Sequence, residues 1–274
     1  PFFRREQPEE TGGAPVVVTT PEVIPTPAPT PEEQADFRAV LLPNTALYDG
    51  TAAEQLQAAG ANTAVFDMKA DDGTLGYISE LALAAQAEVS AADPALNAAI
   101  QLLNDGDITT VARVSCFRDN AIPRADMSLG IKSSAGNWRD EGDCRWLSAA
   151  NAAARQYVIG VCAELAELGF DELLLENCAF PARGQVDYIV AGENYDPDGL
   201  TDALETFCRE LEEALADYPQ LKVSFGSSQA VLTGEANDRS GQTAAWLAEH
   251  AWRVYVAVPA GEIGRAHVRT PVTY

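Results

Sequence analysis

Acidic and amide side chains stand at the point where a predicted strand of this sequence ends. Glu176 and Asn177 directly follow three consecutive leucines, and Gly169 closes the helical stretch before them. Side chains at the carboxyl ends of parallel strands converge on one open face, where α/β proteins place their chemistry. A carboxylate directly after buried leucines is costly unless it is solvated, paired or used. Glu176 is therefore the first candidate for a catalytic carboxylate, and a merely solvated strand-end glutamate is the alternative interpretation.

A second acidic position lies at the end of the strand predicted over 63–68. Asp67 and Lys69 are two residues apart, which in a regular strand puts both side chains on one face. There each would hold the other in its charged form. The residues Asp71-Asp72-Gly73 that follow are typical of a tight turn and predict no chemistry of their own. We expect Asp67 to be catalytic and Lys69 to bind substrate, against the alternative of a solvated turn.

The next predicted strand, 108–117, carries an arginine inside an apolar run, and an aspartate lies just past its end. Arg113 needs a carboxylate partner if it is buried, and Asp67 or Glu176 could supply one across neighbouring strands. Asp119 is expected at the height of the open face. Glycoside hydrolysis uses two carboxyl groups, about 5 Å apart for retention or roughly 6.5–9.5 Å for inversion. Asp67, Asp119 and Glu176, from adjacent strands, are the candidates for that pair.

Two tryptophans follow in the long segment after this strand. Trp138 and Trp146 are flanked by polar residues, which suits a platform for the apolar face of a sugar ring. Packing of a long loop against the core is an equally good interpretation. Trp138 and Trp146 join Lys69, Arg113 and Asn177 as candidates for substrate binding.

Composition excludes several classes of partner. The chain has 274 residues, with 41 acidic and 18 basic side chains, for a formal charge of −23. Nucleic acid and anionic membrane surfaces need clustered Lys and Arg, so neither is expected as a partner. The five cysteines show no metal-type or disulfide spacing, and two histidines are too few for a His-rich metal centre. We therefore expect neither a metal nor a cofactor.

The elements that must position these residues alternate between strand and helix. Strands are predicted over 38–42, 63–68, 108–117, 173–175, 221–225 and 252–258, and helices over 51–59, 96–103, 148–168 (capped by Ser148), 200–216 and 243–249. This order predicts an α/β fold with a parallel sheet covered by helices. A closed (β/α)8 TIM-type barrel takes roughly 250 residues, so six strands predict such a barrel, truncated after about its sixth strand. A doubly wound open sheet is the alternative, but no glycine-rich phosphate loop supports it.

Three segments are expected along the chain. Residues 1–35 are rich in proline and threonine and predict an extended linker, of the kind that holds a domain away from a membrane or wall. Residues 36–261 form the barrel domain, C-terminally incomplete. Residues 262–274 follow abruptly, have no periodicity and resemble sequencing-adapter read-through. An extracytoplasmic location, secreted or anchored to the membrane or cell wall, is expected.

The ordered motifs resemble the putative glycoside hydrolase domain family of bacterial envelope proteins. They are Phe66-Asp67-Met68-Lys69 with Gly73 and Tyr77, Ala112-Arg113-Val114 with Phe117-Arg118-Asp119, Gly136-x-Trp138 with Trp146, Tyr157, and Gly169-Phe170-Asp171-Glu172 ending in Phe180-Pro181. The resemblance covers about 40–258 and implies a TIM barrel distantly like the alpha-amylase and related glycosidase barrels. It assigns the family's Asp-x-Lys pair to Asp67 and Lys69, its Arg to Arg113, and its Lys/Arg-Asp pair to Arg118 and Asp119.

The motif after the fourth strand departs from the family. The usual Phe-Asp-Tyr-x-Arg-Phe-Pro is replaced by Leu175-Glu176-Asn177-Cys178-Ala179-Phe180-Pro181, so the aspartate becomes a glutamate and the tyrosine and arginine are lost. The leading hypothesis is a glycosidase acting on a cell-wall or environmental polysaccharide, with Glu176 as acid or nucleophile and Asp67 or Asp119 as its partner. The altered motif leaves a non-catalytic carbohydrate-binding or wall-associated barrel as the alternative. A metal-dependent deacetylase is disfavoured, since such barrels need histidine ligands.

Overall fold

A curled sheet of six parallel strands is the centre of the molecule. The computed structural model describes residues 37–234 and 239–257. The strands are β1 (Ala39–Leu41), β2 (Thr63–Lys69), β3 (Thr109–Ser115), β6 (Glu172–Glu176), β7 (Lys222–Ser227) and β8 (Val254–Val256), paired in that order. Every neighbouring pair is parallel. A strand order that follows the chain is that of a (β/α)8 barrel, whereas a doubly wound sheet reverses direction at a switch point. The predicted α/β fold of TIM type, represented by six strands, is confirmed, and the doubly wound alternative is wrong.

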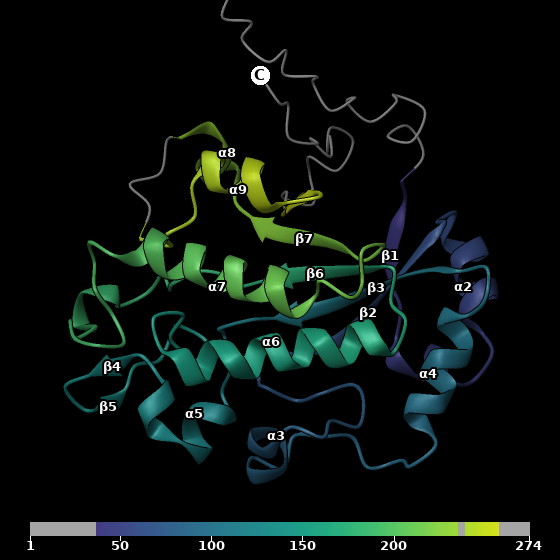
Figure 1. Cartoon of the computed structure of the whole chain (residues 1–274), viewed down its shortest axis with the longest axis horizontal. Helices are drawn as coiled ribbons and strands as arrows, with labels where there is room; N and C mark the ends of the chain where they lie inside the picture. The colour runs from purple at the N-terminus through teal and green to yellow at the C-terminus, as the bar shows by residue number, and fades with distance from the viewer. Residues whose placement is uncertain (1–36, 235–238, 258–274) are drawn as a thin grey trace, which may run out of the picture.

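Helices follow the strands and cover one face of the sheet. The five predicted helices are present as α2 (Ala52–Ala59), α4 (Leu96–Asn104), α6 (Ala152–Glu167), α7 (Leu200–Ala214) and α9 (Ala244–His250). The two long helices, α6 and α7, lie side by side along the sheet (Figure 1). Cys162 on α6 and Cys208 on α7 are buried in the core.

Short elements that the sequence did not predict lie mostly in the segments after β1, β2, β3, β6 and β7. They are η1 (Asn44–Leu47), α3 (Ala82–Gln86), α5 (Ile122–Ala125), η2 (Met127–Leu129), the hairpin of β4 (Lys132–Ser133) and β5 (Gly136–Asn137), η3 (Val186–Tyr188) and α8 (Gln229–Thr233). The segment between β3 and α6 is the longest of these and holds α5, η2 and the hairpin. In barrels, the segments after the strands form the face that carries the active site.

The long helix α6 begins three residues later than predicted. Its N-cap is Asn151, whose side-chain oxygen accepts hydrogen bonds from Ala153 N at 3.1 Å and Ala154 N at 3.2 Å. These are two of the amide groups that a helix leaves unsatisfied at its start. Ser148 instead donates its hydroxyl to the carbonyl of Asn194 at 2.6 Å. The prediction of Ser148 as the cap is therefore wrong.

The two faces of the sheet carry different side chains, because successive residues of a strand alternate. On the helix-covered face, residues such as Phe66 and Leu175 are completely buried in the main core. On the other face, which corresponds to the interior of a barrel, Val65, Val111 and Leu174 form a small separate cluster. Strand-end residues that continue this inner face therefore meet at the carboxyl edge of the sheet.

Two predicted segments fall where the structure gives no description. The linker expected over 1–35 and the read-through expected over 262–274 both lie outside the described residues. Across the part of the chain that is described, no helix has the length and apolar character needed to cross a membrane.

Candidate active site

A bulge at the end of β2 decides which of its side chains reach the open face. In the pairing of β2 with β3, Asp67 lies opposite Arg113, but the next paired residue, Lys69, lies opposite Val114. Between these two pairs β2 contains one more residue than β3, which is a β-bulge. A bulge bends the strand and changes the direction in which the next side chain points. Asp67 remains on the inner face, whereas Lys69 turns to the helix-covered face. The prediction that Asp67 and Lys69 share a face is wrong for this reason.

Three carboxylates meet on the guanidinium of Arg113. Its Nη1 lies 2.8 Å from Asp67 Oδ1, its Nη2 lies 2.8 Å from Asp71 Oδ1, and its Nε lies 2.6 Å from Glu176 Oε2. The predicted partners Asp67 and Glu176 are both confirmed, one from each strand beside β3. The Arg113 side chain is 17% exposed and each of the three carboxylate side chains is 36% exposed. The cluster therefore lies at the surface of the sheet's open end rather than in the core.

A second arginine extends this cluster outward. Arg118, just after β3, pairs with Asp71 through Nη1 and with Asp140 through Nε at 2.6 Å. Asp140 also accepts a hydrogen bond from Trp146 Nε1 at 3.0 Å. We call Asp67, Asp71, Glu176, Asp140, Arg113 and Arg118 the carboxylate–arginine network. Four carboxylates against two guanidinium groups leave it with a formal charge of −2.

The charges of the network hold one another in place. Burial would raise the pKa of Asp71, but hydrogen bonds from Arg113 and Arg118 and the charge of Arg113 lower it below its usual value. Burial likewise acts against the charge of Arg113, and the surrounding Asp71, Glu176 and Asp67 nevertheless raise the pKa of that guanidinium. Such charge-assisted hydrogen bonds are among the stronger ones in proteins. They fix the geometry of the site before any ligand arrives.

Asn177 is the residue that joins the end of β6 to this network. Its backbone is left-handed, with φ of 49°, a conformation that asparagine adopts more readily than most residues. Its side-chain amide donates to Ser115 Oγ at 2.9 Å and to Asp71 Oδ1 at 3.3 Å. The predicted substrate-binding residue Asn177 therefore lies in the network, where it orients Asp71.

Lys69 and Asp119 form a pair of their own beneath the network. Their side chains have no exposed surface, and Lys69 Nζ lies 2.7 Å from Asp119 Oδ2. Lys69 Nζ also donates to the carbonyl of Ser115 at 2.7 Å, and Asp119 Oδ1 accepts from the amides of Ala121 and Ile122, each at 2.9 Å. Complete burial argues against the predicted roles of Asp119 in catalysis and of Lys69 in substrate binding. This geometry is that of a structural ion pair.

The two predicted sugar-stacking tryptophans are also buried. Trp138 is 3% exposed and Trp146 is 8% exposed. Trp138 donates its indole N–H to the carbonyl of Gln185 at 3.0 Å, and Trp146 donates to Asp140. Both belong to the packing of the segment between β3 and α6, the alternative interpretation of the sequence. Trp146 affects the site indirectly, through Asp140 and Arg118.

Asp71 and Asp140 are site residues that the sequence did not predict. Asp71 was assigned to a turn, and the turn is present, with Gly73 N donating to the carbonyl of Ala70 at 3.0 Å. The same turn points Asp71 at both arginines. Arg118 was the available clue, because a guanidinium at the end of a buried strand needs carboxylate partners nearby. Cys144, in the same loop, is buried, which raises the pKa of its thiol to about 11 and makes it a poor nucleophile.

A hollow of about 360 Å³ adjoins the network at Asp67. It is lined by residues 41–44, which follow β1, and by Ala70 and residues 74–76, which follow β2. Small-ligand sites have volumes in the range of roughly 300–1,000 Å³. The hollow lies at the carboxyl end of the sheet, so a ligand within it would contact Asp67.

Comparisons with known proteins agree with this architecture. A family described as "Putative glycosyl hydrolase domain" matches residues 50–256. A hypothetical protein from Ruminiclostridium thermocellum ATCC 27405 is 24% identical, with a TM-score of 0.56 over 68% of this chain and 96% of that chain. The PgaB (BpsB) glycoside hydrolase domain from Bordetella bronchiseptica is 15% identical, with a TM-score of 0.58 over 84% of this chain and 76% of that chain.

A third solved structure, the alpha-galactosidase from Lactobacillus brevis, is 11% identical, with a TM-score of 0.50 over 81% of this chain and 30% of that chain. At these identities the structural likeness shows the fold alone. No curated protein matches the chain.

Proposed function

Because the chain belongs to the family of putative glycosyl hydrolase domains, we propose that it is a glycosidase whose carboxylate pair is Glu176 and Asp67. One observation carries the proposal: carboxylates from β2 and β6 meet on Arg113 at the end of the sheet where barrels hold their active sites. The substrate we propose is a cell-wall or environmental polysaccharide or oligosaccharide, met outside the cytoplasm. The proline-rich composition of residues 1–35 supports that location.

The hydrogen bonds divide the carboxylates into two kinds. Asp71 uses one oxygen for Arg113 and Asn177 and the other for Arg118. Glu176 and Asp67 each use a single oxygen for Arg113. Within residues 37–234 and 239–257, the second oxygen of both has no hydrogen-bond partner. Glu176 and Asp67 therefore have oxygens free to reach a substrate, and Asp71 serves to hold the arginines.

The shared guanidinium limits how far apart these two carboxylates can lie. Two oxygens bound to one planar guanidinium can be no more than about 8 Å apart, a limit that admits both the retaining and the inverting arrangement. Arg113 hydrogen-bonds to both carboxylates, so this contact does not assign the acid and the nucleophile or base between them. Asp67 borders the hollow, so of the two it would lie nearer to a ligand held there. In this mechanism one carboxyl group protonates the glycosidic oxygen while the other attacks the anomeric carbon or activates water.

The test is a comparison of cleavage by matched variants. The protein is assayed against cell-wall and plant oligosaccharides beside Glu176→Gln, Asp67→Asn and the control Glu193→Gln, which alters an exposed glutamate outside the network. Loss of about 100-fold or more in turnover is expected for the first two and none for the control. Equal cleavage by Glu176→Gln would overturn its role. Glycan binding that survives both substitutions, without turnover of any ligand, would favour the non-catalytic carbohydrate-binding alternative.

A further inference from the structure

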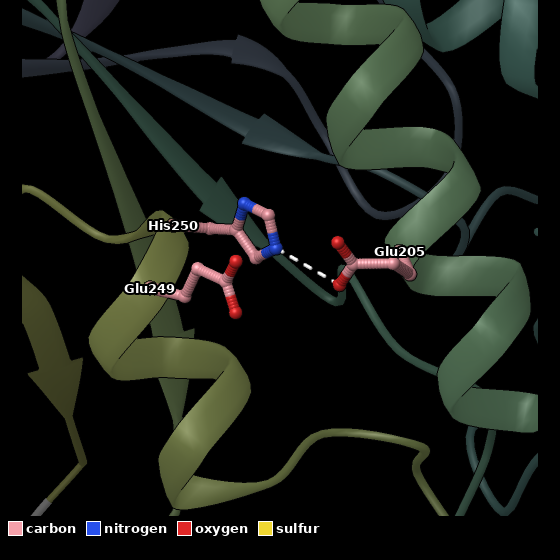
Figure 2. A group of neighbouring side chains, drawn as sticks. All are labelled: Glu205, Glu249 and His250. Carbon is pink, nitrogen blue, oxygen red and sulfur yellow. Dashed lines mark hydrogen bonds and ion pairs between the residues drawn. The ribbon is translucent and has the colours of Figure 1, made fainter. Parts of the chain in front are cut away.

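A second cluster of ligating side chains lies between the helices α7 and α9, away from the carboxylate–arginine network. Glu205 on α7 and Glu249 and His250 on α9 point their ligand atoms toward one another (Figure 2), and these atoms all lie within 4.8 Å of each other. His250 Nε2 is 2.9 Å from Glu205 Oε2. His250 Nδ1 is 3.1 Å from Oε1 of Glu212, about two turns further along α7.

The position of the imidazole is fixed by its surroundings. The His250 side chain is only 7% exposed, and its ring lies 5.6 Å from the ring of Trp246. Glu205, Glu212 and Glu249 extend into the exposed space around it. The imidazole is therefore held rigidly while the carboxylates can adjust. A rigid nitrogen ligand with adjustable oxygen ligands can form a coordination shell with small movements of side chains alone.

The charges at this cluster do not balance. Glu205, Glu212 and Glu249 surround one imidazole, so the group keeps a formal charge of −2 even when His250 is protonated. Glu249 makes no hydrogen bond or ion pair within the described part of the chain, although its carboxylate lies close to that of Glu205. Two neighbouring carboxylates repel each other unless a cation lies between them. A divalent cation, bound to the neutral imidazole in place of its proton, would reduce the charge of the three carboxylates from −3 to −1 and bind all three ligand atoms.

One of the contacts of His250 is of a kind that metal-bound histidines make. Metal-bound histidines almost always engage a carboxylate or carbonyl with the ring nitrogen that does not bind the metal, which fixes the tautomer. Glu212 holds this position at Nδ1, while Nε2 contacts Glu205, and the carboxylate of Glu249 lies within 4.8 Å of both ligand atoms. One nitrogen and two carboxylate ligands suit Zn²⁺, whose bonds to them are roughly 2.0–2.2 Å long. Mg²⁺ and Ca²⁺ prefer all-oxygen sites.

We propose that Glu205, Glu249 and His250 bind one Zn²⁺-class divalent cation that fastens α9 to α7. The helix α9 has seven residues and leads into β8, a strand of three. Short elements such as these gain most from an added cross-link, and a cation that binds only the folded chain stabilises it by mass action. The role is structural, because the cluster lies in the helix layer and not at the carboxyl ends of the strands.

The proposal is tested with a tag-free chain from which metals have been removed by a chelator. Isothermal titration calorimetry with ZnCl2 measures zinc binding, and thermal melting measures its effect on stability. We expect one Zn²⁺ per chain, a rise of several degrees in Tm at saturating zinc, and much weaker binding of Mg²⁺ and Ca²⁺. Glu249→Gln should weaken zinc binding at least tenfold and abolish the rise in Tm. This variant should fold normally, since Glu249 is exposed and makes no hydrogen bond within the described residues.

Glu213→Gln is the matched control, because Glu213 is an exposed glutamate of α7 beside Glu212 and lies outside the cluster. It removes the same charge and should leave zinc affinity unchanged. His250→Gln should abolish binding. The proposal is overturned if the native chain binds no zinc, if Glu249→Gln binds it as tightly, if Glu213→Gln weakens it as much, or if Mg²⁺ and Ca²⁺ bind as tightly as Zn²⁺.

Discussion

Replacing Lys69 by methionine should destabilise the protein far more than it alters the open site. The substitution leaves the Asp119 carboxylate with no exposed surface and only two amide donors, those of Ala121 and Ile122. Removing one partner of a buried ion pair costs about 3–5 kcal/mol. In a domain of this size that loss corresponds to a fall in Tm of roughly 10 °C.

A double-mutant cycle separates the ion pair from other effects of these substitutions. Asp119→Asn keeps an oxygen that can accept from the two amides, but it leaves the buried Lys69 ammonium without a negatively charged partner. This substitution should also lower the free energy of unfolding by about 3 kcal/mol. The double variant buries no unpaired charge, so it should be more stable than the sum of the singles predicts by about 2 kcal/mol or more. Urea unfolding measures all four proteins. Additive losses, or a loss below about 1 kcal/mol for Lys69→Met, would refute the buried pair.

Three further substitutions test the network and its support. Arg113→Lys should lower kcat/KM at least tenfold, since an ammonium lacks the planar donors that meet three carboxylates; unchanged turnover would contradict this. Gly226→Ala places a Cβ 3.0 Å from Glu176 Cγ, so that side chain must move by a few tenths of an ångström; turnover should fall about tenfold with little change in Tm. Glu210→Gln breaks the Arg155–Glu210 pair and should cost about 2 kcal/mol at pH 7. The Arg155 hydrogen bond lowers the pKa of Glu210, so its contribution exists above the unfolded pKa and is lost as pH falls through the folded one. The difference in unfolding free energy should therefore persist at pH 7, begin to shrink as pH falls below the usual glutamate pKa of about 4.3, and vanish only below the lowered folded pKa.

The strands were predictable because their signal is local. The leucines before Glu176 and the apolar run around Arg113 each indicate burial on both faces, as expected for a parallel sheet. The pairing of Arg113 with Asp67 and Glu176 followed from the same logic, since a guanidinium in an apolar strand needs carboxylates on its neighbours. Asp71 could not be found this way, because its role depends on where a turn after β2 points in space.

The sequence around the two tryptophans allowed two interpretations, burial in the loop or contact with a ligand, for a physical reason. Trp138 and Trp146 lie in a segment of more than thirty residues between β3 and α6, and an aromatic side chain there can cover the loop's own core or face a ligand. Only the fold of that segment decides between them. The hydrogen bond from Trp146 to Asp140 shows that the side chain packs inward and still contributes to the site through its polar edge.

The bulge in β2 explains why Lys69 and Asp119, two residues marked by the family's motifs, are buried. With one extra residue at Met68, Lys69 turns away from Asp67 and reaches Asp119 after β3. Asp119 in turn holds the amides that begin α5 and packs against Gly73 in the turn after β2. That turn carries Asp71, which binds Arg113 and Arg118. The buried pair thus fixes the loops after two strands relative to each other, so its effect on the open site is one of positioning.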